Sequence, residues 1–361
     1  MTLRVALVGG PMYDHLYGVL DGLDVEVIVH ADHPSLNRAV ADLLGRGERL
    51  DVISTHSKYA PSQSEWLLPL DHLVDTSELA PLAVDLCRPF DDLMCVPRLI
   101  DVRIMWWRRD RLPAPPDDWN ALVESRTVFG FPGRESGLFG TFFELVAGAR
   151  GRLFDTAGRV TISSPEALVA VEMLARLAER APSDLPSWHY DQVDRALLDG
   201  RIDASGVWPG GWGPIRDSEI ADVLEPALYP AGSHRRVSYS GCHAWAIPRT
   251  CVDPRRSAEL VGRLVGRDAS AIDAAGGNVC ANVASFEAIA PVSPVDARRL
   301  HLTAETIRTS MITYPAHPRF PEVEDFGWTT INEVLRGERT ANEAVGMIHD
   351  HATSVLGSND L

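Results

Sequence analysis

A polar stretch that follows a short apolar run near residue 52 contains the residue types that could perform chemistry. Val52 and Ile53 are typical of a buried strand, and the loop expected after them, residues 54–59 (STHSKY), offers hydroxyls, an imidazole and an amine. In open α/β sheets, ligands bind beyond the carboxyl ends of the strands, so we expect this loop to contact a ligand. Lys58 is the only lysine among the 34 basic residues. Either burial lowers its pKa, so that it could form a Schiff base while His56 moves protons, or it donates a hydrogen bond to ligand or solvent.

Histidines near this stretch raise the question of a metal site. His30 and His33 are three residues apart, and His56 is expected nearby in the fold. The pattern predicts no helix that places both on one face and no carboxylate in register, so we interpret them as surface and helix-capping residues and predict no metal. The five cysteines are an odd number without CxxC spacing. They predict buried free thiols instead of a disulfide framework or a zinc site.

A glycine pair near the N-terminus is the one pattern that could indicate a nucleotide cofactor. Gly9 and Gly10 follow a predicted strand and precede a predicted helix, but the third glycine of a GxGxxG fingerprint is missing. We interpret the pair as a turn that lets the helix approach the strand, and we predict no cofactor. A GxSxG nucleophile elbow is also missing, which argues against a serine hydrolase.

The nine tryptophans form the second group of candidate ligand-binding side chains. A core position is the default for any single tryptophan. The WPGGW stretch at residues 208–212 is different, because it places two large rings around a flexible glycine-rich turn. Aromatic faces beside polar groups suit the C–H faces and hydroxyls of sugars, or a cation held over the ring. Six of the tryptophans fall at or near predicted strand ends and loops, namely Trp106, Trp107, Trp208, Trp212, Trp245 and Trp328.

The composition excludes several classes of function. The 361 residues suffice for two domains with full cores. A net charge of −16 argues against nucleic acid as a partner, because phosphate binding needs a basic face. The chain contains no apolar run of the roughly 20 residues that a membrane helix requires. It opens directly with MTLRVALVGG, which does not read as a secretory leader. We therefore expect either that a leader was removed and the protein acts outside the cytoplasm, or that it stays inside.

Strands and helices alternate over the first hundred residues. The pattern predicts strands at 3–8, 25–30 and 51–54, with helices near 13–20 and over 34–44. Such alternation predicts an α/β fold with a mostly parallel sheet and helices on both faces. Residues 97–107 are expected to form one long buried strand. The later expected elements are a short strand at 129–131, a strand running into the loop at 200–212, a loop leading to a strand at 239–248, and helices at 165–180, 254–265, 321–335 and 341–356.

Five segments, in the same order, resemble the extracellular solute-binding proteins of ABC importers, the sugar-binding family that includes maltose-binding protein. They are the opening strand with its Gly-Gly turn together with DVISTHSKYAPSQSEWLLPL, then PRLIDVRIMWW, LLDGRIDASGVWPGGW, ALYPAG with YSGCHAWAIPRT, and FPEVEDFGWTTINEVLRGERTANEAV. The resemblance implies a type II periplasmic-binding-protein fold, with two α/β lobes, a ligand cleft between them and closure about a hinge. It implies lobe 1 at 1–103 plus 247–305 and lobe 2 at 104–246 plus 306–361.

The resemblance also implies a set of ligand-binding residues. Carboxylates among them would accept hydrogen bonds from sugar hydroxyls while the rings stack. The set comprises His56, Lys58 and Tyr59 in the loop after the third strand, Asp101 at the first crossing, Arg134 and Glu135 in the RES turn, Trp208 and Trp212 in the Gly-Trp loop, His243 and Trp245 at the second crossing, Trp328 in the last helical pair, and, by position, Tyr13 and Asp14.

Three hypotheses for the function remain open at this stage. The first is a monomeric solute receptor for a sugar or polyol, with an ABC permease as its partner. The second is a cytoplasmic biosynthetic enzyme on the same fold that uses Lys58 and His56. The third is a ligand sensor or scaffold outside transport. One fold hosts many functions, so the fold by itself does not choose among them.

Overall fold

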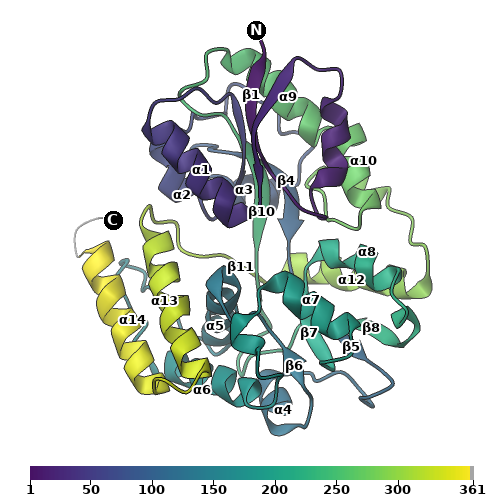
Figure 1. Ribbon diagram of the computed structural model, residues 1–361, viewed down its shortest axis with the longest axis vertical. Coiled ribbons are helices and arrows are strands. Elements are labelled where there is room, and N and C mark those ends of the chain that lie inside the picture. Colours follow the sequence, from purple (N-terminus) through teal and green to yellow (C-terminus); the bar gives the residue numbers. More distant parts are fainter. Residues whose placement is uncertain (358–361) are drawn as a thin grey trace. The chain divides into compact units, whose positions relative to one another are not determined.

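The computed structural model describes residues 1–357, and the chain divides into two compact units (Figure 1). Unit 1 comprises residues 1–101, 209–213 and 241–290, and unit 2 comprises residues 102–208, 214–240 and 291–361. Each unit is therefore assembled from three separate stretches of the chain. In residues 1–357, the structure contains no helix that is both long enough and apolar enough to cross a membrane.

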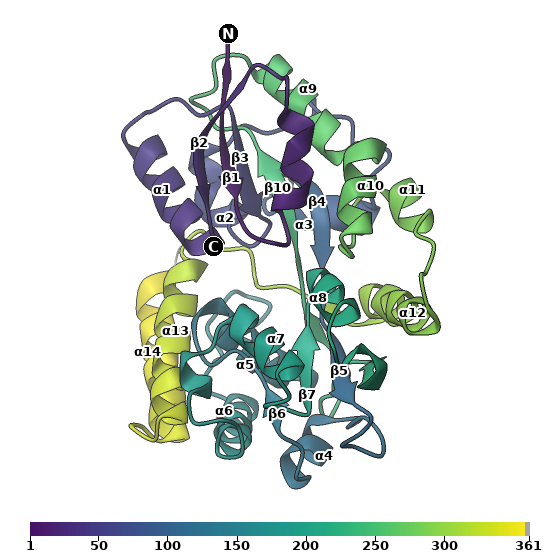
Figure 2. The same cartoon turned by 45° about the vertical axis from the view of Figure 1, so that its right-hand side comes forward.

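Unit 1 is built on a mixed five-stranded sheet with the strand order β2-β1-β3-β10-β4. Strand β1 is parallel to β2 and β3, whereas β10 runs antiparallel between β3 and β4. Helices cover both faces of the sheet, with α1 and α9 on opposite sides (Figures 1 and 2). The strands are β1 (Leu3–Val8), β2 (Val25–Ala31), β3 (Val52–His56), β4 (Val96–Asp101) and β10 (Gly241–Ala246). The helices are α1 (His33–Gly45), α2 (Ala60–Gln63), α3 (Pro81–Leu86), α9 (Pro254–Val265), α10 (Arg267–Ala275) and α11 (Val283–Glu287), with a 3₁₀ helix over Asp14–Leu20.

The termini of the helices in unit 1 follow from side-chain capping. The Asp32 carboxylate accepts the Ser35 N–H at 2.9 Å, which satisfies one of the free amides at the start of α1. Asp253 caps α9 in the same way through Arg256 N–H at 3.1 Å. Strands β3, β4 and β10 are buried along their whole length. Side chains at their ends are therefore held by the packed sheet.

Unit 2 contains a four-stranded sheet with the order β6-β7-β5-β8 and a two-stranded ladder of β9 and β11. Helix α5 is buried nearly all round. Helix α13 packs on α5 and α6, and α14 lies beside α13 and also contacts α6 (Figure 2). The strands are β5 (Ile104–Arg108), β6 (Phe129–Gly130), β7 (Ala204–Val207), β8 (Leu224–Ala227), β9 (Ser238–Tyr239) and β11 (Met311–Ile312). The helices are α4 (Trp119–Glu124), α5 (Glu135–Gly148), α6 (Pro165–Ala178), α7 (Tyr190–Leu198), α12 (Pro294–Thr309), α13 (Phe320–Leu335) and α14 (Ala341–Leu356), and α8 (Trp212–Arg216) begins in the range of unit 1.

Two expected elements differ from the observed ones. The loop expected at residues 54–59 begins later, because β10 pairs with β3 as far as His56 and keeps residues 54–56 extended. The single strand expected at 97–107 is broken into β4 and β5, and the chain leaves unit 1 between them. Within unit 2, the Arg103 N–H donates to Ser238 Oγ at 2.9 Å instead of to a neighbouring strand.

The division into units also differs from the expected lobes. Strand β10 belongs to unit 1 because both of its neighbours, β3 and β4, lie there, so the crossing expected between 246 and 247 falls between residues 240 and 241. Two further crossings, not expected, flank residues 209–213 of unit 1. The crossing expected between 305 and 306 falls between residues 290 and 291, before α12, which packs on β8 and β5 of unit 2. The first crossing, after residue 101, lies close to the expected position.

Candidate ligand-binding site

Three strand ends of unit 1 bring a histidine cluster together, which we define as Tyr13, His33, His56, Asp101 and His243. Strand β3 ends at His56 and β4 ends at Asp101, while His243 lies near the start of β10. Because β10 runs antiparallel between the other two, its start meets their ends, and His243 is directly opposite His56. His33 begins α1, and Tyr13 precedes the 3₁₀ helix. The cluster therefore lies at the carboxyl edge of the parallel strands, where ligands bind in open α/β sheets.

Hydrogen bonds connect the members of the cluster. His243 Nε2 lies 3.1 Å from Asp101 Oδ2 and 2.9 Å from the Tyr13 hydroxyl. Its other ring nitrogen, Nδ1, is 2.8 Å from His33 Nε2. His56 Nε2 is 3.4 Å from the same Asp101 oxygen. His243 is thus the central group, because it also contacts the His56 ring, 5.1 Å away between centroids, and so touches all four other members.

Burial decides the charge state of the cluster. Burial lowers the pKa of His56 to about 3, and the charge on Lys58 contributes to this shift. Burial also lowers the pKa of His33 to about 3, with contributions from the charges on His56 and Lys58. Burial likewise places the pKa of His243 well below its ordinary value, against the opposing effect of Asp101. It raises the pKa of Asp101 to about 6, against the charges on His243 and Arg98. At neutral pH the cluster therefore presents uncharged imidazoles around one carboxylate.

Two more of the proposed ligand-binding residues lie beside the histidine cluster. The Tyr59 ring is 6.3 Å from the His33 ring and 6.4 Å from the His56 ring, measured between centroids. The Lys58 amine lies 4.7 Å from the centroid of the Tyr59 ring. This is the cation–π geometry of a protonated amine, whereas a Schiff-base lysine must be neutral to attack a carbonyl. The contact favours a binding role for Lys58.

Other proposed residues of unit 1 lie elsewhere. Asp14 accepts the Gly10 N–H at 3.1 Å and pairs with His30 at 2.8 Å, so it shapes the turn after β1. Trp245 is only 1% exposed and belongs to the core, which removes the reason to assign it to a ligand. Trp212 is also buried, and its ring packs against Gly277, where a Cβ would lie 3.0 Å from it.

The interpretation of the histidines as surface and capping residues is wrong for two of the three. His56 is buried in β3, and His33 contacts His243, while Asp32 is the residue that caps α1. Only His30 is an exposed histidine, paired with Asp14. Spacing along the chain could not show this, because His243 comes from a strand that is inserted nearly two hundred residues later.

The sequence also gave no sign of the buried ion pair that supports Tyr13. Arg98 donates two hydrogen bonds to Asp273, at 2.7 and 2.8 Å. Its guanidinium also donates to the Tyr13 carbonyl at 3.2 Å and lies 5.7 Å from the centroid of the Trp245 ring. This pair links β4 to α10 and fixes the backbone that carries the Tyr13 hydroxyl.

Unit 2 contributes a row of aromatic rings, which we define as Tyr190, Trp208, Tyr239 and Tyr314. Consecutive ring centroids are 5.7, 6.4 and 4.5 Å apart. The Arg103 guanidinium lies 5.3 Å from the centroid of the Trp208 ring. Only Trp208 was proposed from the sequence. The three tyrosines gave no signal as a group, because they come from α7, β9 and the segment before α13.

Glu135 and Arg134 lie beside this aromatic row. They pair at 2.8 Å, and His189, whose ring contacts the Tyr190 ring, lies 3.4 Å from the Glu135 carboxylate. Glu135 has a φ of 56°, a left-handed conformation that is uncommon for a residue with a Cβ and is found preferentially at functional sites. Trp328 lies apart from these contacts, with its indole N–H donated to Asp325 within α13 at 3.3 Å.

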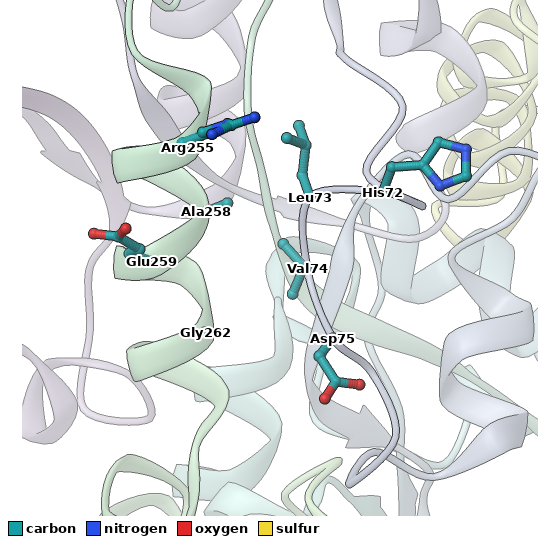
Figure 3. Close-up of a pocket in the computed structure, with 8 residues that line it drawn as sticks. All are labelled: His72, Leu73, Val74, Asp75, Arg255, Ala258, Glu259 and Gly262. Carbon is teal, nitrogen blue, oxygen red and sulfur yellow. The ribbon is translucent and has the colours of Figure 1, made fainter.

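A pocket on the surface of unit 1 offers a different kind of site. Figure 3 shows it between α9 and the loop at residues 72–75. The proposed ligand-binding residues are not among those that line it, and its lining includes no phenyl, phenol or indole ring. We therefore place the candidate ligand-binding side chains of unit 1 in the histidine cluster, and those of unit 2, taken by itself, in the aromatic row. The pocket is lined by His72, Leu73, Val74, Asp75, Arg255, Ala258, Glu259 and Gly262.

Comparisons with known proteins establish the fold. No protein-family model matches the sequence, and no curated protein matches it. The maltose-bound MalE3 of T. maritima superposes with a TM-score of 0.87 at 19% identity, covering 98% of this chain and 100% of its own. An ABC transporter solute-binding protein of Thermotoga lettingae with bound tagatose has a TM-score of 0.83 at 18% identity, covering 99% of this chain and 100% of its own. Another from Agrobacterium radiobacter, with bound ribitol, has a TM-score of 0.82 at 17% identity, covering 98% of each chain. The chain thus has the two-lobed, type II periplasmic-binding-protein fold, which confirms the predicted fold class.

Proposed function

We propose that this protein is the solute-binding component of an ABC-type importer and that its ligand is a sugar or polyol. The observation that carries the proposal is the fold match over nearly the full chain to proteins determined with maltose, tagatose and ribitol bound. The partner would be an ABC permease, and the protein would act as a monomer outside the cytoplasm.

The side chains support this ligand class. Imidazole nitrogens and the Tyr13 hydroxyl can each donate or accept a hydrogen bond, and Asp101 accepts, which suits hydroxyls that do both. In the aromatic row of unit 2, the partly exposed Tyr190 and Trp208 offer ring faces for the C–H surface of a sugar ring. Glu135 would accept further hydroxyl bonds beside that row. The net charge of −16 disfavours anionic ligands such as sugar phosphates.

Calorimetry with a panel of neutral sugars and polyols tests the proposal. Maltose, tagatose and ribitol should head the panel, and small-angle scattering should show compaction when a ligand binds, because binding proteins of this type close by hinge motion. His243→Ala and Trp208→Ala should each weaken binding at least tenfold, about 1.4 kcal/mol. His301→Ala serves as the matched control, because its side chain is 73% exposed on α12. Absence of binding to every member of the panel by the folded protein would refute the proposal.

An enzymatic role for Lys58 has a separate test. A Schiff base between its amine and a carbonyl ligand would be trapped by borohydride as a stable adduct, with the mass of the ligand added to the peptide that contains Lys58. Because the amine lies over the Tyr59 ring, we expect no adduct. A trapped adduct at Lys58 would favour the enzyme over the receptor.

A further inference from the structure

Three potential metal ligands converge in the histidine cluster. One donor atom each from His56, Asp101 and His243 lies within 4.8 Å of the other two, and all three residues are buried. They stand on the three adjacent strands β3, β4 and β10, so their backbones are held in place by the ladder hydrogen bonds of the sheet. We propose that His56, His243 and Asp101 bind a divalent transition-metal ion of the zinc type. The proposal is independent of sugar binding, since it concerns the protein without any sugar.

The spacing of the donor atoms suits such an ion. Zinc binds imidazole nitrogen at about 2.0–2.1 Å and carboxylate oxygen at about 2.0–2.2 Å with tetrahedral geometry, which puts neighbouring donors roughly 3.3–3.5 Å apart. Asp101 Oδ2 is 3.1 Å from His243 Nε2 and 3.4 Å from His56 Nε2. The two imidazole nitrogens lie within 4.8 Å of each other, so the rings of His56 and His243 would move closer together when the ion binds.

The chemical types of the donors also suit a cation. Two buried imidazoles beside one buried carboxylate are a ligand set that zinc accepts. Among residues 1–357, the groups within hydrogen-bond or ion-pair distance of the Asp101 carboxylate are imidazoles, and the Arg98 guanidinium is bound to Asp273. A divalent ion would place a positive charge directly against the buried carboxylate.

His33 and Tyr13 would complete the surroundings of the ion. When His243 Nε2 binds a metal, its Nδ1 carries the proton and donates it to His33 Nε2, 2.8 Å away. His33 Nδ1 is a buried polar atom without a hydrogen-bond partner in the described part of the chain. The Tyr13 hydroxyl, 2.9 Å from His243 Nε2, stands where a fourth ligand could bind. With three protein ligands, that fourth position could instead take water or a hydroxyl of a bound molecule.

One hydrogen bond opposes metal binding. The Lys58 N–H donates to His56 Nδ1 at 3.1 Å, which places the His56 proton on Nε2 in the metal-free protein. Ligation through Nε2 requires the proton to move to Nδ1, and the Lys58 N–H then loses this acceptor. We therefore expect weaker binding than at a closed structural zinc site, with one ion per chain.

Titration of the full chain with metal ions tests the inference. The protein is stripped with a chelator and titrated with Zn²⁺ by calorimetry, and with Co²⁺ by visible absorption. We expect one Zn²⁺ per chain and the intense visible bands of four-coordinate Co²⁺. The variants H56N and H243N should lose the ion, and H33N should bind about 10–100-fold more weakly, as for other residues that orient a ligand. The control H301N should bind as the parent chain does, because His301 is remote and exposed.

Several results would overturn the proposal. Zinc that binds H56N and H243N as tightly as the parent chain would be held by other histidines. A Co²⁺ spectrum with only the weak bands of the hydrated ion would exclude the site even if those variants failed to fold. Because the titrations contain no sugar, failure here leaves the proposed sugar binding untouched. Failure of the sugar panel likewise leaves the metal measurement intact.

Discussion

The Gly241→Ala substitution tests whether the fold holds the histidine cluster in place. Gly241 opens β10, opposite Asp101 in the sheet. A Cβ at this position would lie 2.2 Å from Cε1 and 2.9 Å from Nε2 of the His56 ring, distances that atoms in proteins do not tolerate. Either the His56 ring moves away from Asp101 or the start of β10 moves. Both responses disturb the cluster.

The loss of stability expected for Gly241→Ala follows from the packing around the His56 ring. His56 is buried and held by the Lys58 N–H, so its ring has little room to yield. Overpacking of this kind costs typically 1–3 kcal/mol. Urea denaturation should therefore show Gly241→Ala less stable than the parent chain by about that amount, and Zn²⁺ and sugar affinity should fall with it.

The matched control is Gly262→Ala in α9. Here a Cβ would meet no atom within 4 Å, and alanine is favoured over glycine inside a helix by about 0.5–1 kcal/mol. This variant should be as stable as the parent chain or more so, with unchanged ligand affinity. If Gly241→Ala kept both stability and affinity, the argument that strand β10 fixes the His56 ring would be refuted.

Three further substitutions probe the groups that support the site. Although burial alone would raise it, the pKa of Asp273 is lowered, chiefly by hydrogen bonds from Arg98. Its ionisation therefore stabilises the fold above the unfolded-state pKa of about 3.9, and this stability is lost as the pH falls below that value. In Asp273→Asn, the free energy of unfolding measured with urea should depend less on pH between pH 5 and 3. The variant should also lose about 3–5 kcal/mol of stability at pH 7, because Arg98 remains buried and charged. An unchanged pH dependence would contradict the assignment. Arg103→Met should lower the stability by a similar amount, about 3–5 kcal/mol, because it leaves the buried Glu144 carboxylate without its ion-pair partner. The double variant with Glu144→Leu should recover much of this loss. A double variant whose loss equals the sum of the two single losses would contradict the pairing. Trp245→Ala should lower the stability by about 3–5 kcal/mol, because its ring belongs to the core. Weaker sugar binding at unchanged thermal stability would instead indicate that Trp245 binds the ligand.

The sequence determined the elements that depend on local chemistry. The helix at 254–265 and the last two helices appear as expected, and the first and last of these three are capped by Asp253 and Thr340. Proline in the first turn, an acceptor at the N-cap and an apolar face are all encoded within about a dozen residues, so they can be recognised without the rest of the fold. The alternation of strands and helices likewise indicated the fold class that the solved structures confirm.

The composition of the candidate site was decided by the tertiary structure. His33, His56 and His243 are far apart in the chain, and they meet only because β10 is inserted antiparallel between β3 and β4. The same pairing extends β3 through residues 54–56 and buries Trp245, two changes that the local pattern did not indicate. Residue types show which side chains could bind a ligand or an ion. Which of them share one site depends on strand order, and strand order is a property of non-local pairing.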